Sequence, residues 1–149
     1  MLVQTSRFGS LDVDEQRLIT FPSGILGFPQ SKVYALVQTG EESLFYWLQA
    51  IDRADLAFVV CDPRLFITDY RTPLRAEEMS LLGLDSSDGA QVFVIVNKVD
   101  DLLTGNLQGP LVVNVKSRVA RQLVLSDKRY STRHPLMRIP SRVPMGKTA

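Results

Sequence analysis

The stretch that decides the fold is residues 44–70, LFYWLQAIDRADLAFVVCDPRLFITDY. It holds the only Trp and the only Cys of the chain, and polar turns separate its aromatic and β-branched runs. Runs of this length and composition are typical of strands rather than helices. We predict strands at 44–51, 56–61 and 65–68, and the second ends before Pro63, because proline removes a backbone donor. The second run has no polar residue, which predicts that both of its faces are covered.

The flanking sequence adds further short strands around this centre. Apolar or β-branched runs predict them at 2–5, 9–13, 18–21, 31–38, 91–96, 111–115 and 122–125. One helix is expected to begin with Thr72 as N-cap and Pro73 as first residue and to end at Gly83, and residues 100–105 predict a loop or a single helical turn. About nine or ten strands with one short helix predict a mainly β protein, a small antiparallel β-barrel-like or sandwich domain.

Length and composition favour a single domain from a reducing compartment. A chain of 149 residues can bury roughly 70% of its unfolded surface, and a single Cys cannot form an internal disulfide. No apolar run reaches the ~20 residues of a membrane span, and the N-terminus lacks the apolar segment of a signal peptide. We therefore expect a cytoplasmic protein without membrane contact.

The net charge of +1 conceals a division along the chain. Residues 1–101 carry 8 Lys/Arg and 15 Asp/Glu, whereas residues 102–149 carry 9 and 1. Such asymmetry is found in proteins with nucleic-acid-binding tails, but also in ordinary proteins with a solvated basic end. Residues 137–149 are expected to form a disordered basic tail, because they have too little apolar surface to bury.

An RNA-binding β-barrel that uses the basic end is the alternative function. The cations that would contact phosphates are Lys116, Arg118, Arg121 and Arg133. Against this alternative, the basic end has no aromatic residue except Tyr130 on which bases could stack.

The sequence shows no catalytic or metal-binding pattern. Cys61 lies inside an apolar run, where a cysteine is usually a small buried hydrophobic residue, and the only histidine is His134. A hydrolase built on this pair is the weakest alternative. One His and one Cys cannot make a usual zinc site, and no glycine motif for phosphate binding is present. We expect no enzymatic activity, no metal and no cofactor.

Residues 21–29, FPSGILGFP, predict a loop whose path is fixed by two prolines and two glycines. Its apolar side chains are Ile25, Leu26 and Phe28. They either plug one end of the core or form an apolar binding surface, because rigid loops often carry recognition residues.

An ordered set of motifs resembles one protein family. In chain order the motifs are FPSGILGF (21–28), FYWLQ (45–49), LAFVVCDP (56–63), LFITDY (65–70), NL (106–107), PLVVN (110–114) and YSTRHPL (130–136). Over residues 1–136 the chain resembles the flagellar assembly factor FliW. Residues 137–149 have no counterpart in the family pattern.

The resemblance implies a small β-barrel-like protein without enzymatic activity that binds flagellin in the cytoplasm. It also implies binding to the translational repressor CsrA. Free flagellin then occupies the protein, whereas flagellin export frees it to antagonise CsrA, which couples flagellin synthesis to flagellar assembly. We expect a monomer when free, with no direct contact to nucleic acid.

Two surfaces are expected to bind these partners. A basic RNA-binding protein such as CsrA favours carboxylates, and an amphipathic flagellin helix favours an apolar groove. The predicted contact residues are therefore acidic residues for CsrA (Asp62, Asp69, Glu77 and Glu78) and the apolar loop with aromatic residues for flagellin (Ile25, Phe28, Tyr46, Phe66 and Tyr70).

Overall fold

Antiparallel strands form the framework of the protein. The computed structural model describes residues 1–40 and 43–139. The strands within them are β1 (Leu2–Thr5), β2 (Gly9–Asp12), β3 (Ile19–Thr20), β4 (Val33–Val37), β5 (Phe45–Ala50), β6 (Ala57–Cys61), β7 (Ala90–Val99), β8 (Leu102–Gly105), β9 (Leu111–Asn114), β10 (Ala120–Gln122) and β11 (His134–Arg138). The helical elements are α1 (Ala76–Leu82) and the 3-10 turns η1 (Glu15–Arg17), η2 (Pro63–Leu65) and η3 (Ser87–Gly89).

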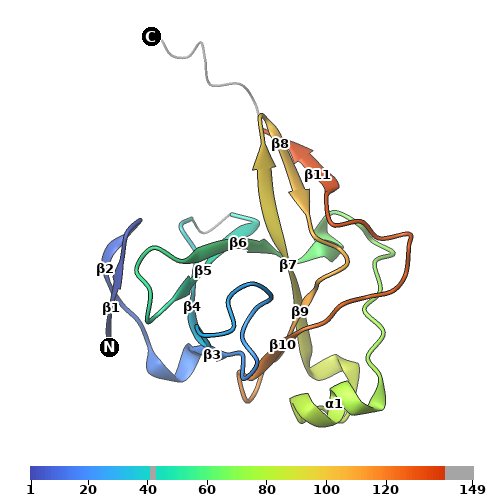
Figure 1. Cartoon of the computed structure of the whole chain (residues 1–149), viewed down its shortest axis with the longest axis horizontal. Helices are drawn as coiled ribbons and strands as arrows, with labels where there is room; N and C mark the ends of the chain where they lie inside the picture. The colour runs from blue at the N-terminus through green and yellow to red at the C-terminus, as the bar shows by residue number, and fades with distance from the viewer. Residues whose placement is uncertain (41–42, 140–149) are drawn as a thin grey trace.

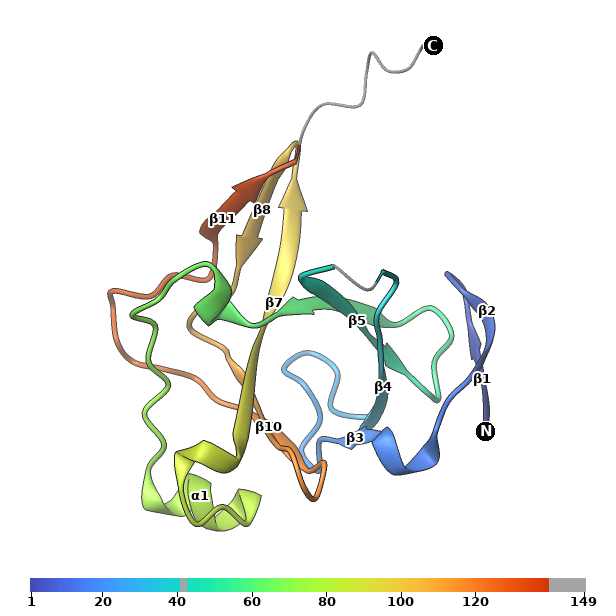
Figure 2. The same cartoon turned by 180° about the vertical axis from the view of Figure 1, so that it is seen from behind.

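One nine-stranded sheet curls around the main core (Figures 1 and 2). The main core is the buried cluster that includes Ile19, Tyr34, Leu48, Val60 and Phe93. The strand order of the sheet is β10-β9-β7-β6-β5-β4-β3, and β8 and β11 branch from β7. The two ends of this order meet where the N–H of Thr20 donates to the carbonyl of Arg118 at 2.9 Å, beside a parallel bridge from Thr20 to Val119. The result is a β half-barrel, which confirms the predicted mainly β, antiparallel barrel-like fold with one short helix.

Strand β7 joins the two parts of the sheet. Its first half pairs with β9, its second half with β8, and β6 lies along its other edge. Phe93 points into the main core, whereas Val94 and Val96 point into a second cluster. Strand β6 is likewise covered on both faces, with Val60 in the main core and Cys61 in the second cluster. The continuous apolar runs at 92–96 and in β6 therefore match two buried faces.

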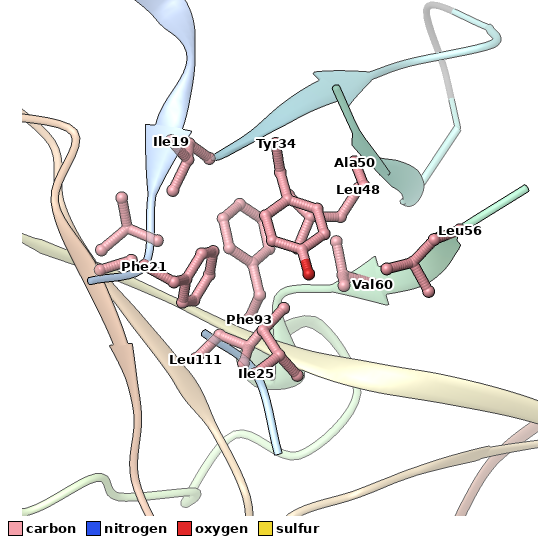
Figure 3. Close-up of a cluster of buried hydrophobic side chains, with 12 residues drawn as sticks. Ile19, Phe21, Ile25, Tyr34, Leu48, Ala50, Leu56, Val60, Phe93 and Leu111 are labelled. Atoms are coloured by element: carbon pink, nitrogen blue, oxygen red, sulfur yellow. The ribbon is translucent and has the colours of Figure 1, made fainter. Parts of the chain in front are cut away.

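The loop at 21–28 closes one end of the curled sheet. Ile25 is only 2% exposed, and the ring of Phe21 lies 5.6 Å from that of Tyr34. Phe28 packs edge-on against Phe58 at 5.3 Å. Figure 3 shows Phe21, Ile25 and Tyr34 gathered in one cluster. Of the two interpretations of this loop, the structure supports the core plug.

The hairpin β1–β2 forms a separate two-stranded sheet beside the half-barrel. The guanidinium of Arg7 lies 4.4 Å from the ring centre of Trp47, and the ring of Phe8 lies 5.9 Å from the same ring. The N–H of Ser6 donates to the carbonyl of Ala54 at 2.8 Å. A cation–π contact, an aromatic pair and one backbone bond thus fasten the hairpin to the body.

Residues 65–68 do not form the predicted third strand. The carboxylate of Asp62 accepts the N–H of Arg64 at 2.9 Å and caps the 3-10 turn η2, in which Pro63 takes the first position. The N–H of Ile67 then donates to the carbonyl of Pro63 at 2.8 Å. The aspartate cap and the proline ring favour a helical turn here, and this local preference overrides the apolar composition.

The helix begins later than its sequence predicts, although it ends where expected. Its N-cap is Arg75, not Thr72, and Pro73 precedes the helix. The carboxylate of Glu78 accepts the backbone N–H of Arg75 at 3.0 Å, as the glutamate of a capping box does. Gly83 ends the helix with φ 69, the left-handed conformation that glycine adopts without strain.

Residues 100–105 form a strand rather than the predicted loop or helical turn. Asp100 adopts φ 56 and turns the chain back, so that β8 pairs with β7 and in turn pairs with β11. Met137 and Arg138 belong to β11, although the sequence places them in a disordered tail. The N–H of Ile139 donates to the carbonyl of Asp101 at 2.7 Å, and residues 140–149 of the predicted tail lie outside the described residues.

Replacing Gly24 by alanine is expected to destabilise the core plug strongly. Gly24 has φ +71, and an added Cβ would lie 2.6 Å from the Cα of Pro29 and 2.8 Å from the carbonyl oxygen of Phe28. Backbone strain and overpacking together should lower the free energy of unfolding by about 3 kcal/mol or more. Thermal unfolding followed by circular dichroism measures the effect.

The matched control is Gly27→Ala. Gly27 has φ +90, but nothing lies within 4 Å of its added Cβ, so only the backbone strain of about 1–3 kcal/mol applies. Equal melting temperatures for the two variants would show that the close approach at Gly24 carries no energetic cost.

Candidate functional site

A surface groove passes over Tyr46. It lies apart from the region of β5 and β6 that the loop at 21–28 covers. Two adjoining hollows of about 440 and 360 Å³ share Leu36, Gln38 and Tyr46. The first hollow is bounded by the segment from β2 to η1, and the second by Leu44 and Leu65. Together we name these two hollows the Tyr46 groove. Their size is that of an ordinary ligand or peptide site.

The floor of the Tyr46 groove is apolar because side chains alternate along β4 and β5. Leu36 and Tyr46 point to the same side as the main core and pack against it, yet both stay partly accessible. The ring of Tyr46 lies 6.0 Å from that of Phe93. Leu44 and Leu65, at the rim, are 44% and 58% exposed. Apolar side chains gathered at one accessible hollow are typical of an interaction site.

The remaining rim of the Tyr46 groove is charged. Its acidic members are Asp12, Asp14 and Asp62, and its basic members are Arg17 and Arg118. The carboxylate of Asp62 is already engaged, since it forms an ion pair with Arg64 at 3.3 Å and accepts from the side-chain amide of Gln91 at 3.2 Å. An apolar floor within a polar rim suits an amphipathic segment.

The structure brings two of the predicted contact residues, Tyr46 and Asp62, to this groove. Phe66 lies elsewhere, half-buried against Phe45 with the ring centres 5.7 Å apart. Phe28 is half-buried in the loop plug. These two side chains pack into the core clusters and do not line the groove.

Ile25 and Tyr70 are enclosed and offer no surface to a partner, contrary to the sequence-based expectation. Ile25 is 2% and Tyr70 is 3% exposed. The hydroxyl of Tyr70 donates to the carbonyl of Leu107 at 2.7 Å, and its ring lies 4.7 Å from that of Tyr130. The hydroxyl of Tyr130 accepts the N–H of Arg71. This tyrosine pair fastens the segment after η2 to the body.

The predicted acidic residues do not form one surface. Glu78 lines a separate hollow of about 340 Å³ between α1 and the segment after β10, and Asp62 is not part of it. Burial disfavours the charged form of Glu78, but hydrogen bonds and the charge of Arg75 outweigh this effect and lower the pKa of the carboxyl. Asp69 and Glu77 are exposed. Of the four predicted acidic residues, Asp69 and Glu77 are therefore the exposed ones, and both lie outside the groove.

The basic residues of the RNA-binding alternative are also divided. Lys116, Arg118 and Arg121 belong to the hairpin of β9 and β10, whereas Arg133 precedes β11. Tyr130, the one aromatic residue available for stacking, is 9% exposed. This arrangement lacks the continuous basic groove with aromatic platforms that single-stranded RNA favours.

Cys61 lacks the surroundings of a catalytic thiol. Its side chain is fully buried in the second core cluster. Burial, and to a lesser degree the charge of Asp62, raise the pKa of the thiol to about 12. Among the described residues, no hydrogen bond joins it to His134, and no group of three or more His, Cys, Asp or Glu side chains could hold a metal ion.

The comparisons with known proteins agree with the fold and with the motifs. The sequence profile of the FliW protein family matches residues 2–136. The chain belongs to the FliW family. The flagellar assembly factor FliW of Heliobacterium modesticaldum is 40% identical over 138 residues, which cover 91% of this chain and 90% of the relative. That of Bdellovibrio bacteriovorus is 38% identical over 138 residues, with 91% and 79% covered.

A solved FliW structure shows the same architecture. The crystal structure of a flagellar assembly factor FliW matches with a TM-score of 0.84 at 29% sequence identity, and the match covers 92% of this chain and 97% of the other. FliW is a family of assembly factors. Within the part of the chain that the structure describes, no helix is long and apolar enough to cross a membrane.

Several residues of the FliW motifs serve the scaffold. The side-chain amide of Asn114 donates to the carbonyl of Leu82 at 2.8 Å, and its oxygen accepts the N–H of Lys116 at 2.9 Å. This one side chain docks the end of α1 on the turn that follows β9. Leu36, Leu44 and Leu65 line the groove but are not among the predicted contact residues, because nothing local separates an exposed leucine from a core leucine.

Cys61 is expected to react slowly with thiol reagents in the native protein. With a pKa of about 12, only a minute fraction of the thiol is ionised at pH 8, and the thiolate is the reactive form. A spectrophotometric thiol titration should show slow labelling of the folded chain and complete labelling in denaturant. Stoichiometric labelling of folded protein within seconds would revive the hydrolase alternative.

Proposed function

We propose that this FliW-family protein binds flagellin and CsrA and antagonises CsrA, so that flagellin synthesis follows flagellar assembly. Membership of the family supports the role in flagellar assembly. The observation that carries the binding proposal is the Tyr46 groove, whose apolar floor and rim leucines stay accessible in the folded chain. Flagellin occupies this groove until its export frees the protein to act on CsrA.

The groove suits one apolar stripe of an amphipathic helix. Leu36 and Tyr46 form the floor, and Leu44 and Leu65 form the rim of the second hollow. A helix presents such a stripe through residues spaced by three or four, and it keeps its polar face toward solvent. The loop at 21–28 is the weaker candidate for this contact, because Ile25 is enclosed in the main core.

CsrA is assigned to the accessible carboxylates outside the groove, Asp69 and Glu77. Residues 1–101 carry a net charge of −7, and a negative surface attracts a basic RNA-binding protein and repels its RNA. Exposed charges of this kind act mainly on the association rate, and salt screens them. With two separate surfaces, flagellin and CsrA could each change the affinity for the other without competing for the same residues.

The double variant Leu44→Ala, Leu65→Ala is expected to weaken flagellin binding. Both side chains are largely exposed in the free protein, so their loss should leave folding stability nearly unchanged. If they anchor the helix, the dissociation constant should rise by about 5- to 150-fold, which corresponds to about 1–3 kcal/mol. Isothermal titration calorimetry with purified monomeric flagellin measures the change, and circular dichroism checks the fold.

The matched control is Val124→Ala, which removes an apolar side chain that is 76% exposed and lies outside the Tyr46 groove. It should bind flagellin like the wild type. CsrA binding measured on the same variants tests the two-surface arrangement. Retained flagellin binding by the double leucine variant would remove the groove from the proposal, and a parallel loss of CsrA binding would indicate one shared site.

A further inference from the structure

Arg118 is a cation at the edge of the Tyr46 groove, and no described residue forms an ion pair with it. It lies in the turn between β9 and β10 and lines the first hollow of the groove. One Nη donates to the carbonyl of Arg17 at 2.8 Å, while the buried Nε has no partner within the described part of the chain. None of the ion pairs among the described residues includes Arg118. Its charge therefore has no counter-ion within residues 1–40 and 43–139.

The backbone conformation at Arg118 is unfavourable for an arginine. Arg118 has φ 64, in the left-handed region that favours glycine or asparagine. Closure of the sheet requires this conformation, since the carbonyl of Arg118 accepts from Thr20 while its N–H donates to the carbonyl of Asn114 at 2.8 Å. An arginine here costs about 1–2 kcal/mol of backbone strain. Its side chain makes one backbone hydrogen bond in return.

The surroundings of Arg118 are also electrostatically unfavourable. Burial, together with the positive charge of Arg17, lowers the pKa of its guanidinium, which nevertheless stays protonated. The acidic residues that line the same hollow have other partners: Asp12 pairs with the N-terminal amino group at 3.2 Å, and Asp14 accepts the N–H of Gln16 at 2.9 Å. A half-buried, unpaired guanidinium beside an apolar floor is a site prepared for a carboxylate.

We infer that Arg118 determines specificity by pairing with an Asp or Glu side chain at the edge of the apolar stripe of the helix bound in the Tyr46 groove. The inference rests on the proposed binding of a flagellin helix in that groove. The floor residues Leu36 and Tyr46 line the same hollow as Arg118, so one helix can bury its apolar stripe and present a carboxylate there. The neighbouring Arg17 adds repulsion against a helix with a basic edge.

The decisive variant is Arg118→Gly, because folding and binding should respond differently. Glycine relieves the left-handed strain, so the melting temperature should stay within about two degrees of the wild type or rise. Loss of a partly buried charge pair should raise the dissociation constant for monomeric flagellin at least about tenfold. A residue needed only for the fold would give the reverse pattern, with a lower melting temperature and unchanged affinity.

Two controls separate this pairing from general electrostatics. Arg71→Gln removes the same charge from an exposed arginine outside the Tyr46 groove and should bind like the wild type. Arg118→Asn also tolerates the left-handed backbone and should reproduce the binding loss of Arg118→Gly. An equal loss of affinity in the Arg71 variant would overturn the pairing in favour of overall charge.

The partner side is tested with synthetic peptides of the flagellin terminal helices in which each Asp or Glu is replaced by Asn or Gln. One replacement should weaken binding to the wild type at least about tenfold and leave binding to Arg118→Gly unchanged. If wild-type protein binds flagellin but no replacement couples to Arg118, the inference fails while the proposed function stands. If the wild type does not bind flagellin at all, both fail.

Discussion

One backbone contact closes the curled sheet, and much of the structure depends on it. The hydrogen bond from Thr20 to the carbonyl of Arg118 joins β3 to the β9–β10 hairpin, which are the two ends of the strand order and lie side by side in both views. An open sheet would leave two unpaired edges and a wet concave face. Closure encloses the main core, and it also holds Arg118 in the left-handed conformation beside the Tyr46 groove.

The two ends of the curled sheet differ: one is filled by packed side chains, and the other leaves apolar side chains accessible. At one end the loop at 21–28 fills the curl with Phe21 and Ile25, which leaves Leu26 exposed and Phe28 half-buried. At the other end Leu36 and Tyr46 reach the surface. Motif residues that look suited to binding are therefore used for packing, whereas the accessible groove is lined by side chains without a distinctive pattern.

The sequence by itself determined the features that depend on local preferences. Strands β5, β6 and β7 lie where aromatic and β-branched runs predict them, and Gly83 ends the helix in the left-handed conformation. Cys61 is buried, as its position inside an apolar run indicates. The ordered motifs also predicted the family, because many weak local matches in one order are specific together.

Only the tertiary structure decided which apolar side chains are covered and which segments pair. Ile25 is enclosed while its neighbour Leu26 is 78% exposed, although the two have nearly the same hydrophobicity. Strand β8 lies between β7 and β11, and nothing in 100–105 alone requires a strand. The physical reason is that the burial of a side chain, the pairing of strands and the surroundings of Arg118 all depend on contacts between segments far apart in the chain. A local pattern limits such contacts but does not specify them.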